Sequence, residues 1–209
     1  MPKITVLLVD IGDVIAFYDV PSFTQYVTTR GASAAKDQEF FRTHKSAYDE
    51  GTLSDEEFWK GHVAFTGVKS TPKELKVKIR SIVRVDQELL TALGELRKRG
   101  LKIVLASNID ENTLRRIKEL VDVERSFDGA YFSCEQGLLK RNPEFFRRIM
   151  AAEGFRPEEA LFIDDYEKNL VVAEQLGIKT YRYTNYEHFR KHVNNLLEGR
   201  KTKKLKKPF

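Results

Sequence analysis

The stretch Ile4-Thr-Val-Leu-Leu-Val-Asp-Ile-Gly-Asp13 decides the fold of this chain. Its first six residues, 4–9, are aliphatic or β-branched and carry no charge. Near-continuous apolar character over so short a run predicts a strand that is buried on both faces of a parallel sheet. The run ends in the carboxylate of Asp10. Ligands bind at the carboxyl ends of strands in open α/β sheets, so Asp10 is expected at a ligand-binding edge, unless it only caps a turn.

Beyond residue 84 the chain alternates between strand-like and helix-like segments. Strands are expected over 102–107, 129–133, 160–164 and 179–183, and helices over 86–99, 111–121, 143–153, 167–176 and 186–197. With the first strand this makes five strands joined by crossover helices, which predicts a three-layer, Rossmann-like parallel α/β sheet. We assign residues 1–18 and 84–198 to this core.

Residues 19–83 show helix signals and no convincing buried strand. Ser54-Asp-Glu-Glu57 and Thr71-Pro-Lys-Glu74 are capping boxes, the second with proline at the favoured first helical position. This segment is therefore expected to be an inserted helical cap of about four helices. The short apolar run before it, 14–19, is expected to form a hairpin or an extended flap.

Composition indicates a folded globular protein, because 41% of the residues are hydrophobic and 32% are charged. No apolar run is long enough to span a membrane or to form a secretory signal, so we expect no membrane partner. The chain has one cysteine, Cys134, which excludes an internal disulfide and fits a reducing cytoplasm. We expect the protein to be cytoplasmic.

The basic charge of the chain belongs to its last residues. Six Lys or Arg and no acid lie in 200–209, and without them the formal net charge of +5 becomes −1. We expect 199–209 to be a disordered basic tail, with binding to an anionic partner as the alternative. No nucleic-acid partner is expected apart from weak binding through this tail. The sequence leaves the oligomeric state open.

Polar residues follow the predicted strands at the edge where ligands bind. The set is Asp10, Ser107, Asn108, Lys140, Asp164 and Asp165. Each residue alone could be a turn residue, a helix cap or a solvated charge. Their joint occurrence at strand ends is more specific, because these ends lie along one edge of a parallel sheet.

This set of side chains suits a phosphoryl group. Asp10 and Asp165 offer hard oxygen ligands for Mg²⁺. The Ser107 hydroxyl and neighbouring backbone N–H groups can bind phosphate oxygens, and Lys140 adds a compact positive charge. A carboxylate repels a phosphate dianion unless a cation lies between them. Mg²⁺ would cancel this repulsion and leave Asp10 free to attack phosphorus as a nucleophile.

Four motifs make the chain similar to the haloacid dehalogenase (HAD) superfamily over about residues 4–185. They are Val9-Asp-Ile-Gly12-Asp13, Leu105-Ala-Ser107-Asn108, Lys140-Arg-Asn-Pro143 and Phe162-Ile-Asp164-Asp165-Tyr-Glu-Lys-Asn169. With its small helical cap, the chain resembles the branch of sugar-phosphate phosphatase-like hydrolases.

The resemblance implies roles for these residues. Asp10 would be the nucleophile. The implied Mg²⁺ ligands are Asp10, the backbone carbonyl of Gly12 and Asp165, with Asp164 supporting the metal or Lys140. Ser107, Asn108 and Lys140 would hold the phosphoryl group, and Asn169 would bond within the fourth motif.

Position 12 departs from the family pattern. The family's phosphatases usually carry there a second Asp that protonates the leaving group, and this chain has Gly12. Such general acid catalysis is typically worth about 10²–10⁴ in rate. Asp13 is a candidate substitute if the chain makes one helical turn after Asp10, because residue 13 would then share the face of residue 10. Otherwise Asp13 is a turn residue or an outward-facing cap.

We therefore expect a Mg²⁺-dependent phosphatase of a small phosphorylated metabolite, acting through an aspartyl-phosphate. The alternative is a weakly active or inactive HAD-like phosphate-binding protein, since Gly12 lacks the acid. A 2-haloacid dehalogenase fits less well, because that reaction does not need the paired acids Asp164-Asp165. The cap would set the substrate, with Arg42, His44 and Trp59 as candidate specificity residues.

Overall fold

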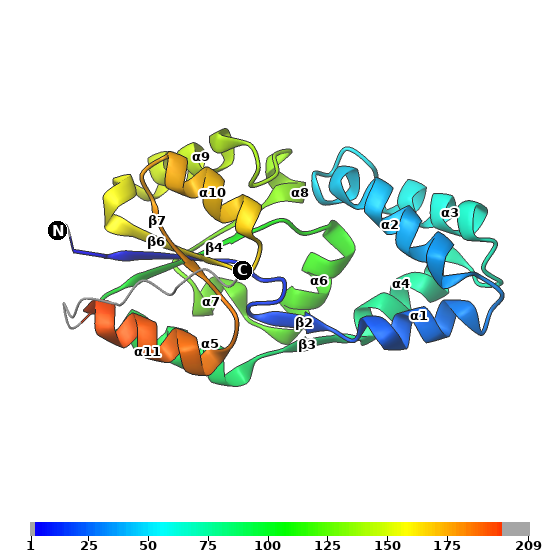
Figure 1. Ribbon diagram of the computed structural model, residues 1–209, viewed down its shortest axis with the longest axis horizontal. Coiled ribbons are helices and arrows are strands. Elements are labelled where there is room, and N and C mark those ends of the chain that lie inside the picture. Colours follow the sequence, from blue (N-terminus) through cyan, green and yellow to red (C-terminus); the bar gives the residue numbers. More distant parts are fainter. Residues whose placement is uncertain (1–2, 198–209) are drawn as a thin grey trace, which may run out of the picture.

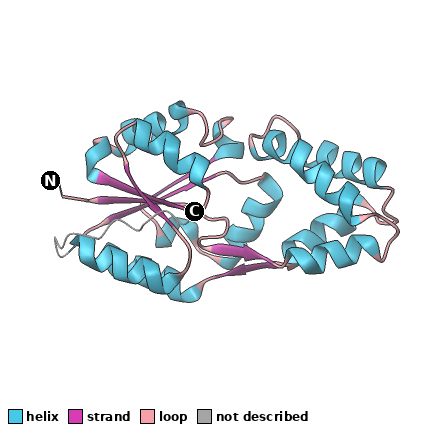
Figure 2. Cartoon of the chain, in the orientation of Figure 1, coloured by secondary structure: helices cyan, strands magenta, loops and turns pink. Residues whose placement is uncertain are grey.

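The computed structural model of the chain describes residues 3–197 and has two parts, a sheet with flanking helices and a smaller group of helices (Figures 1 and 2). Five parallel strands form the central sheet in the order β5-β4-β1-β6-β7. They are β1 (Val6–Val9), β4 (Lys102–Ser107), β5 (Gly129–Phe132), β6 (Ala160–Asp164) and β7 (Lys179–Arg182). The predicted five-stranded parallel fold is confirmed, and β1 is its central strand. This strand begins at Val6, two residues later than the apolar run suggested.

Helices cover both faces of the sheet (Figure 1). One face packs against α5 (Gln87–Lys98), α6 (Glu111–Leu120) and α11 (Tyr186–Leu197), and the other against α9 (Pro143–Glu153) and α10 (Glu167–Gln175). Leu7 and Val9 face the first layer, whereas Val6 and Leu8 face the second. Because both faces are buried, β1 has no polar side, which explains its continuous apolar sequence.

Three short helical segments of the core were not predicted. They are α7 (Val123–Ser126), α8 (Ser133–Gln136) and the 3₁₀ turn η1 (Pro157–Glu159). Segments of three or four residues are too short to show a helical repeat of apolar residues, so the sequence pattern carries no signal for them.

Four helices make up the inserted part of the chain: α1 (Val20–Thr28), α2 (Ala34–Asp49), α3 (Asp55–Thr66) and α4 (Pro72–Ser81). Both predicted capping boxes are formed, by Ser54 with Glu57 and by Thr71 with Glu74. The helices enclose an apolar cluster of their own that contains Phe40, Phe58 and Trp59. These helices form a cap-like insertion beside the sheet (Figure 2).

A two-stranded antiparallel ribbon connects the cap to the core. It pairs β2 (Ala16–Tyr18) with β3 (Val83–Val85). The run 14–19 therefore provides one strand of a ribbon rather than a complete hairpin. The strand β3 was not predicted; it begins at Val83, at the end of the stretch from Ser22 to about Val83 in which the sequence showed no good buried strand. With three residues and one buried side chain, β3 is too short for a strand pattern to appear.

Direct contacts hold the cap against the core. The Ser133 hydroxyl donates a hydrogen bond of 2.5 Å to the carbonyl of Asp49 at the end of α2. Next to it, a Cβ on Gly51 would lie 2.8 Å from the Cys134 carbonyl oxygen, and the φ of Gly51 is +77°. Both the positive φ and the close approach require glycine there.

No helix within residues 3–197 is long and apolar enough to cross a membrane. The predicted basic tail, 199–209, lies outside the described residues.

Candidate active site

The strand register places Asp10 at the carboxyl edge of the sheet. Val9 pairs with Leu105 on one side and with Ile163 on the other. The next N–H, that of Asp10, donates to the Ile163 carbonyl at 2.9 Å and so keeps Asp10 in line with the end of β6. Its side chain is buried, and Oδ1 accepts a 2.7 Å hydrogen bond from the Ile11 N–H.

Asp10 sits in an environment that opposes its negative charge. Burial raises the pKa of Asp10 to about 7, against the lowering influence of Lys140, and the nearby charge of Asp164 adds to the rise. The Ser107 hydroxyl, which is also fully buried, favours the ionised form of Asp10. The site therefore needs positive charge to hold Asp10 as a carboxylate.

Lys140 supplies part of that charge. Its side chain is 0% exposed, and its Nζ lies 2.7 Å from Asp10 Oδ1 and 2.6 Å from Asp164 Oδ2. Burial by itself lowers the pKa of Lys140, but the two carboxylates outweigh it and raise the pKa. Its backbone N–H donates to Asn108 Oδ1 at 2.8 Å, which joins the loop before α9 to the end of β4.

Asp164 is the partner that holds Lys140 in place. Its Oδ1 also accepts the Tyr166 N–H at 2.7 Å, and the Asn169 amide nitrogen lies 3.2 Å from Oδ1 and 3.1 Å from Oδ2. Both carboxylate oxygens are therefore already hydrogen-bonded within the protein, which fits a supporting position for Asp164.

Three carboxylates converge at one point of this edge. Asp10, Asp164 and Asp165 offer ligand atoms that all lie within 4.8 Å of one another. Burial raises the pKa of Asp165, and the charges of Asp164 and Asp13 raise it further. Like charges so close favour a bound cation, and an all-oxygen set suits Mg²⁺. The acidic cluster fits the magnesium ion that the sequence predicted.

Asp13 lies in a tight turn that begins directly after Asp10. The N–H groups of residues 14–16 all donate to the Ile11 carbonyl, and the Asp13 N–H donates to the Ala16 carbonyl at 2.8 Å before the chain enters β2. Of the two predicted alternatives, this matches Asp13 as a turn residue. Asp13 has a φ of 52°, which Asp adopts more readily than most residues, and its side chain is exposed. Its charge raises the pKa of Asp165, which places Asp13 near the acidic cluster.

A cavity of about 440 Å³ opens between the cap and this edge of the sheet. The core lines it with Gly12 and Asn108, next to the acidic cluster, and the cap contributes aromatic, aliphatic and some polar side chains. Of the three candidate specificity residues, Trp59 lines the cavity. His44 stacks instead on Phe40 at 4.2 Å between ring centroids. Arg42 is exposed and is not among the lining residues.

Sequence reasoning missed most polar residues of this cavity, among them Tyr18, Lys45 and Asp110. Lys45 on α2 forms ion pairs with Asp49 one turn on and with Asp110, whose Oδ2 lies 3.2 Å from Nζ. The spacing of Lys45 and Asp49 was visible in the sequence. The pairing with Asp110 was not, because it exists only where the cap meets the core.

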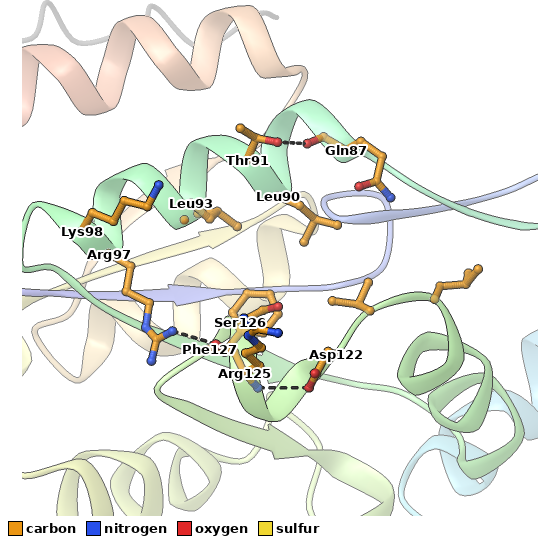
Figure 3. Close-up of a pocket in the computed structure, with 13 residues that line it drawn as sticks. Gln87, Leu90, Thr91, Leu93, Arg97, Lys98, Asp122, Arg125, Ser126 and Phe127 are labelled. Atoms are coloured by element: carbon orange, nitrogen blue, oxygen red, sulfur yellow. Dashed lines mark hydrogen bonds between the residues drawn. The ribbon is translucent and has the colours of Figure 1, made fainter.

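A larger groove of about 700 Å³ lies between α5 and α7 (Figure 3). Its walls include Leu90, Arg97 and Phe127, and Arg97 Nη1 donates there to the Arg125 carbonyl at 2.8 Å. None of the predicted site residues lines this groove. Size alone does not mark the site, so the smaller cavity beside Asp10 is the candidate.

The fold and the acidic edge define a HAD-type hydrolase. The family model of haloacid dehalogenase-like hydrolases matches residues 4–177, and the chain belongs to this family. A D-ribitol-5-phosphate phosphatase of Bacteroides thetaiotaomicron is 26% identical over 204 residues, which are 92% of this chain and 98% of that protein. Bifunctional epoxide hydrolase 2 of Rattus norvegicus is 26% identical over 100 residues, 46% of this chain but 18% of that protein.

A solved structure agrees with these matches. It is a HAD family enzyme of Bacteroides thetaiotaomicron in complex with magnesium and inorganic phosphate. It superposes with a TM-score of 0.79 at 25% identity and covers 90% of this chain and 99% of the other. The predicted family is confirmed.

Lys140→Met is expected to lower the free energy of unfolding by about 3–5 kcal/mol, because it leaves buried carboxylates without their countercharge. The measurement is urea unfolding without divalent cations, and added Mg²⁺ should restore part of the loss. Arg141→Met is the matched control, since Arg141 is the exposed neighbour. Equal losses in the two variants would show that the Lys140 charge does not stabilise this site.

Proposed function

We propose that this protein is a Mg²⁺-dependent phosphomonoesterase that acts on a small phosphorylated metabolite through an aspartyl-phosphate on Asp10. The observation that carries the proposal is the buried Lys140, held between Asp10 and Asp164 beside the carboxylate of Asp165. A phosphoryl group bound there would meet a nucleophile, a cation and an acidic metal site at once. The single cysteine fits a reducing cytoplasm as the place of action.

Asp10 is oriented for attack by two donors on one oxygen. Its Oδ1 accepts from the Ile11 N–H and lies within an ion-pair distance of Lys140, which supports Oδ2 as the atom that attacks phosphorus in this proposal. The new bond joins Oδ2 to phosphorus as the ester P–O bond breaks, and the leaving oxygen takes a proton from solvent or from Asp13 to depart as an alcohol. Water then attacks phosphorus, the Oδ2–P bond breaks, and phosphate leaves with Asp10 restored.

The metal site and the phosphate-binding residues have separate tasks in this proposal. Asp10, Asp165 and the Gly12 carbonyl would hold Mg²⁺, which supplies charge neutralisation between carboxylate and phosphate. Asp164 keeps Lys140 in position. Ser107, Asn108 and Lys140 would bind the phosphoryl oxygens, with Asn108 also fixing the Lys140 backbone.

The leaving group has no acid at position 12. Asp13 is a candidate substitute, but it is exposed and lies in a turn. The lack of an acid at Gly12 favours a second candidate function, a weakly active or inactive phosphate-binding protein. The two functions differ in whether natural esters are turned over.

The deciding experiment is phosphate release from sugar phosphates, nucleotides and a reactive aryl phosphate, with Mg²⁺ and with a chelator. We expect release from at least one natural ester, and we expect chelation to abolish it, because uncompensated carboxylates repel the phosphate dianion. Binding of inorganic phosphate without any turnover would support the binding protein instead. Release that persists unchanged in chelator would contradict the role of Mg²⁺.

A further inference from the structure

The cap gives the cavity an apolar wall. Its aromatic part is a cluster in which Phe23 and Phe41 each lie 6.2 Å from Trp59 between ring centroids, in edge-to-face arrangements. Val20, Ile79 and Ile82 add aliphatic surface. A wall of this kind offers dispersion contacts and no hydrogen bonds.

Most polar groups of the cavity are engaged with protein partners. Among the described residues that line it, the side chains of Tyr18, Thr24 and Gln38 form no hydrogen bond with another described residue. Asp37 Oδ1 lies 2.7 Å from His62 Nε2, and Asp110 accepts from the Thr113 N–H and hydroxyl as well as from Lys45. The Tyr48 hydroxyl donates to Asp55 and lies 3.3 Å from the Trp59 indole nitrogen. A polyol with several hydroxyls would meet mostly groups that already have partners, and each buried hydroxyl left unpaired is unfavourable.

The phosphate end of the cavity is fixed by the core. Gly12 and Asn108 belong to the edge that carries Asp10 and Lys140, and both line the cavity. An ester whose phosphoryl group lies at this edge would extend its leaving group toward the cap. The leaving group is thus the part of the substrate that the apolar wall contacts.

We infer that this cavity selects a phosphomonoester whose leaving group is an apolar hydrocarbon, aromatic or aliphatic, over one whose leaving group is a polyol. The inference rests on the proposed phosphatase function and names its substrate class. This substrate preference would distinguish the chain from the similar protein named D-ribitol-5-phosphate phosphatase, despite the shared fold.

The test compares pentyl phosphate with D-ribitol 5-phosphate. Both are primary five-carbon esters, so the chemistry at phosphorus is matched and the hydroxyls are the difference. We expect kcat/KM to favour pentyl phosphate by at least about 10-fold, in line with the discrimination of apolar pockets. Phenyl phosphate shows whether the pocket prefers a ring. Equal values, or a preference for D-ribitol 5-phosphate, would overturn the inference and leave the phosphatase standing.

Two variants on α4 locate the preference. Ile79 lines the cavity, whereas Val77 on the same helix is 61% exposed and does not. Ile79→Asn is expected to lower kcat/KM for pentyl phosphate by at least about 10-fold and to narrow the ratio of kcat/KM for pentyl phosphate to that for D-ribitol 5-phosphate. Val77→Asn, with the same change in helix propensity, should alter neither value. Equal effects of the two variants on pentyl phosphate would count against the cavity.

Binding without turnover gives an independent readout. Trp59 is the only tryptophan in the sequence and lines the cavity, so its emission reports what enters. Pentylphosphonate with Mg²⁺ should change the emission of Trp59 saturably. Inorganic phosphate, which lacks the pentyl group, should compete with pentylphosphonate more weakly than pentyl phosphate does. If no ester releases phosphate, the proposed function fails. A flat titration with pentylphosphonate overturns the apolar site itself.

Discussion

Asp10→Asn is expected to lower phosphate release by at least about 10⁴-fold, because it removes the nucleophile on which the whole reaction depends. An amide nitrogen and a neutral carbonyl oxygen cannot form the aspartyl-phosphate. The measurement is kcat with saturating Mg²⁺ on the best ester of the panel. Single-turnover quench with radiolabelled ester should show a labelled protein only in the wild type.

The fold should survive this substitution. Burial raises the pKa of Asp10, so the charged form is held against an unfavourable environment, and a neutral amide of the same shape avoids that cost. Lys140 keeps Asp164 as a partner. The control is the thermal midpoint of unfolding, which should lie within a few degrees of the wild type. For a chain of this size, a change of 1 kcal/mol in stability shifts this midpoint by about 2–4 °C. Full activity in the Asn variant would rule out Asp10 as the nucleophile.

Gly12→Asp is expected to raise turnover of alkyl phosphates by about 10²–10⁴-fold, because it places a general acid at a position that has no side chain. The structure has room for it. A Cβ at Gly12 meets no atom within 4 Å, and Gly12 is not among the residues with positive φ. The nearby carboxylates of Asp10 and Asp165 should raise the pKa of the new side chain and favour its protonated form.

Two comparisons isolate the proton transfer in this variant. Gly12→Asn fills the same space without an acid and should leave alkyl phosphates slow. An aryl phosphate should gain little in Gly12→Asp, since its leaving group needs no protonation. Equal gains from Asp and Asn would attribute the effect to packing. No gain on alkyl esters would mean that another group of this chain already supplies the proton, with Asp13 as the first residue to replace.

The core could be predicted from the sequence because its signal is local. The apolar run before Asp10 and the alternation of strands and helices follow from burial on both faces of a parallel sheet. The order of the motifs then placed Asp10, Lys140 and Asp164 at one edge, and the structure joins them by contacts of 2.6–2.7 Å. The position of β3 was missed, because three residues are too few for a periodic pattern.

The path of the chain after Asp10 could not be predicted from the neighbouring residues alone. The chain does turn after Asp10, since the N–H groups of residues 14–16 donate to the Ile11 carbonyl, but Asp13 takes a φ of 52° within that turn. The chain then enters β2, whose partner β3 comes some seventy residues later in the sequence. A pairing partner that distant cannot be inferred from the residues beside Asp13. The tertiary fold therefore decided that Asp13 lies exposed at the rim of the acidic cluster.

The sequence by itself determined the α/β core, the cap of helices and the chemistry of the phosphate edge, because apolar periodicity, capping boxes and strand-end carboxylates are written into neighbouring residues. Only the tertiary structure decided which side chains line the cavity beside this edge. Trp59, Lys45 and Asp110 come from separate helices and a loop, and they share one cavity only because the cap packs against the strand ends. Specificity is a property of that junction, since no single segment contains its wall.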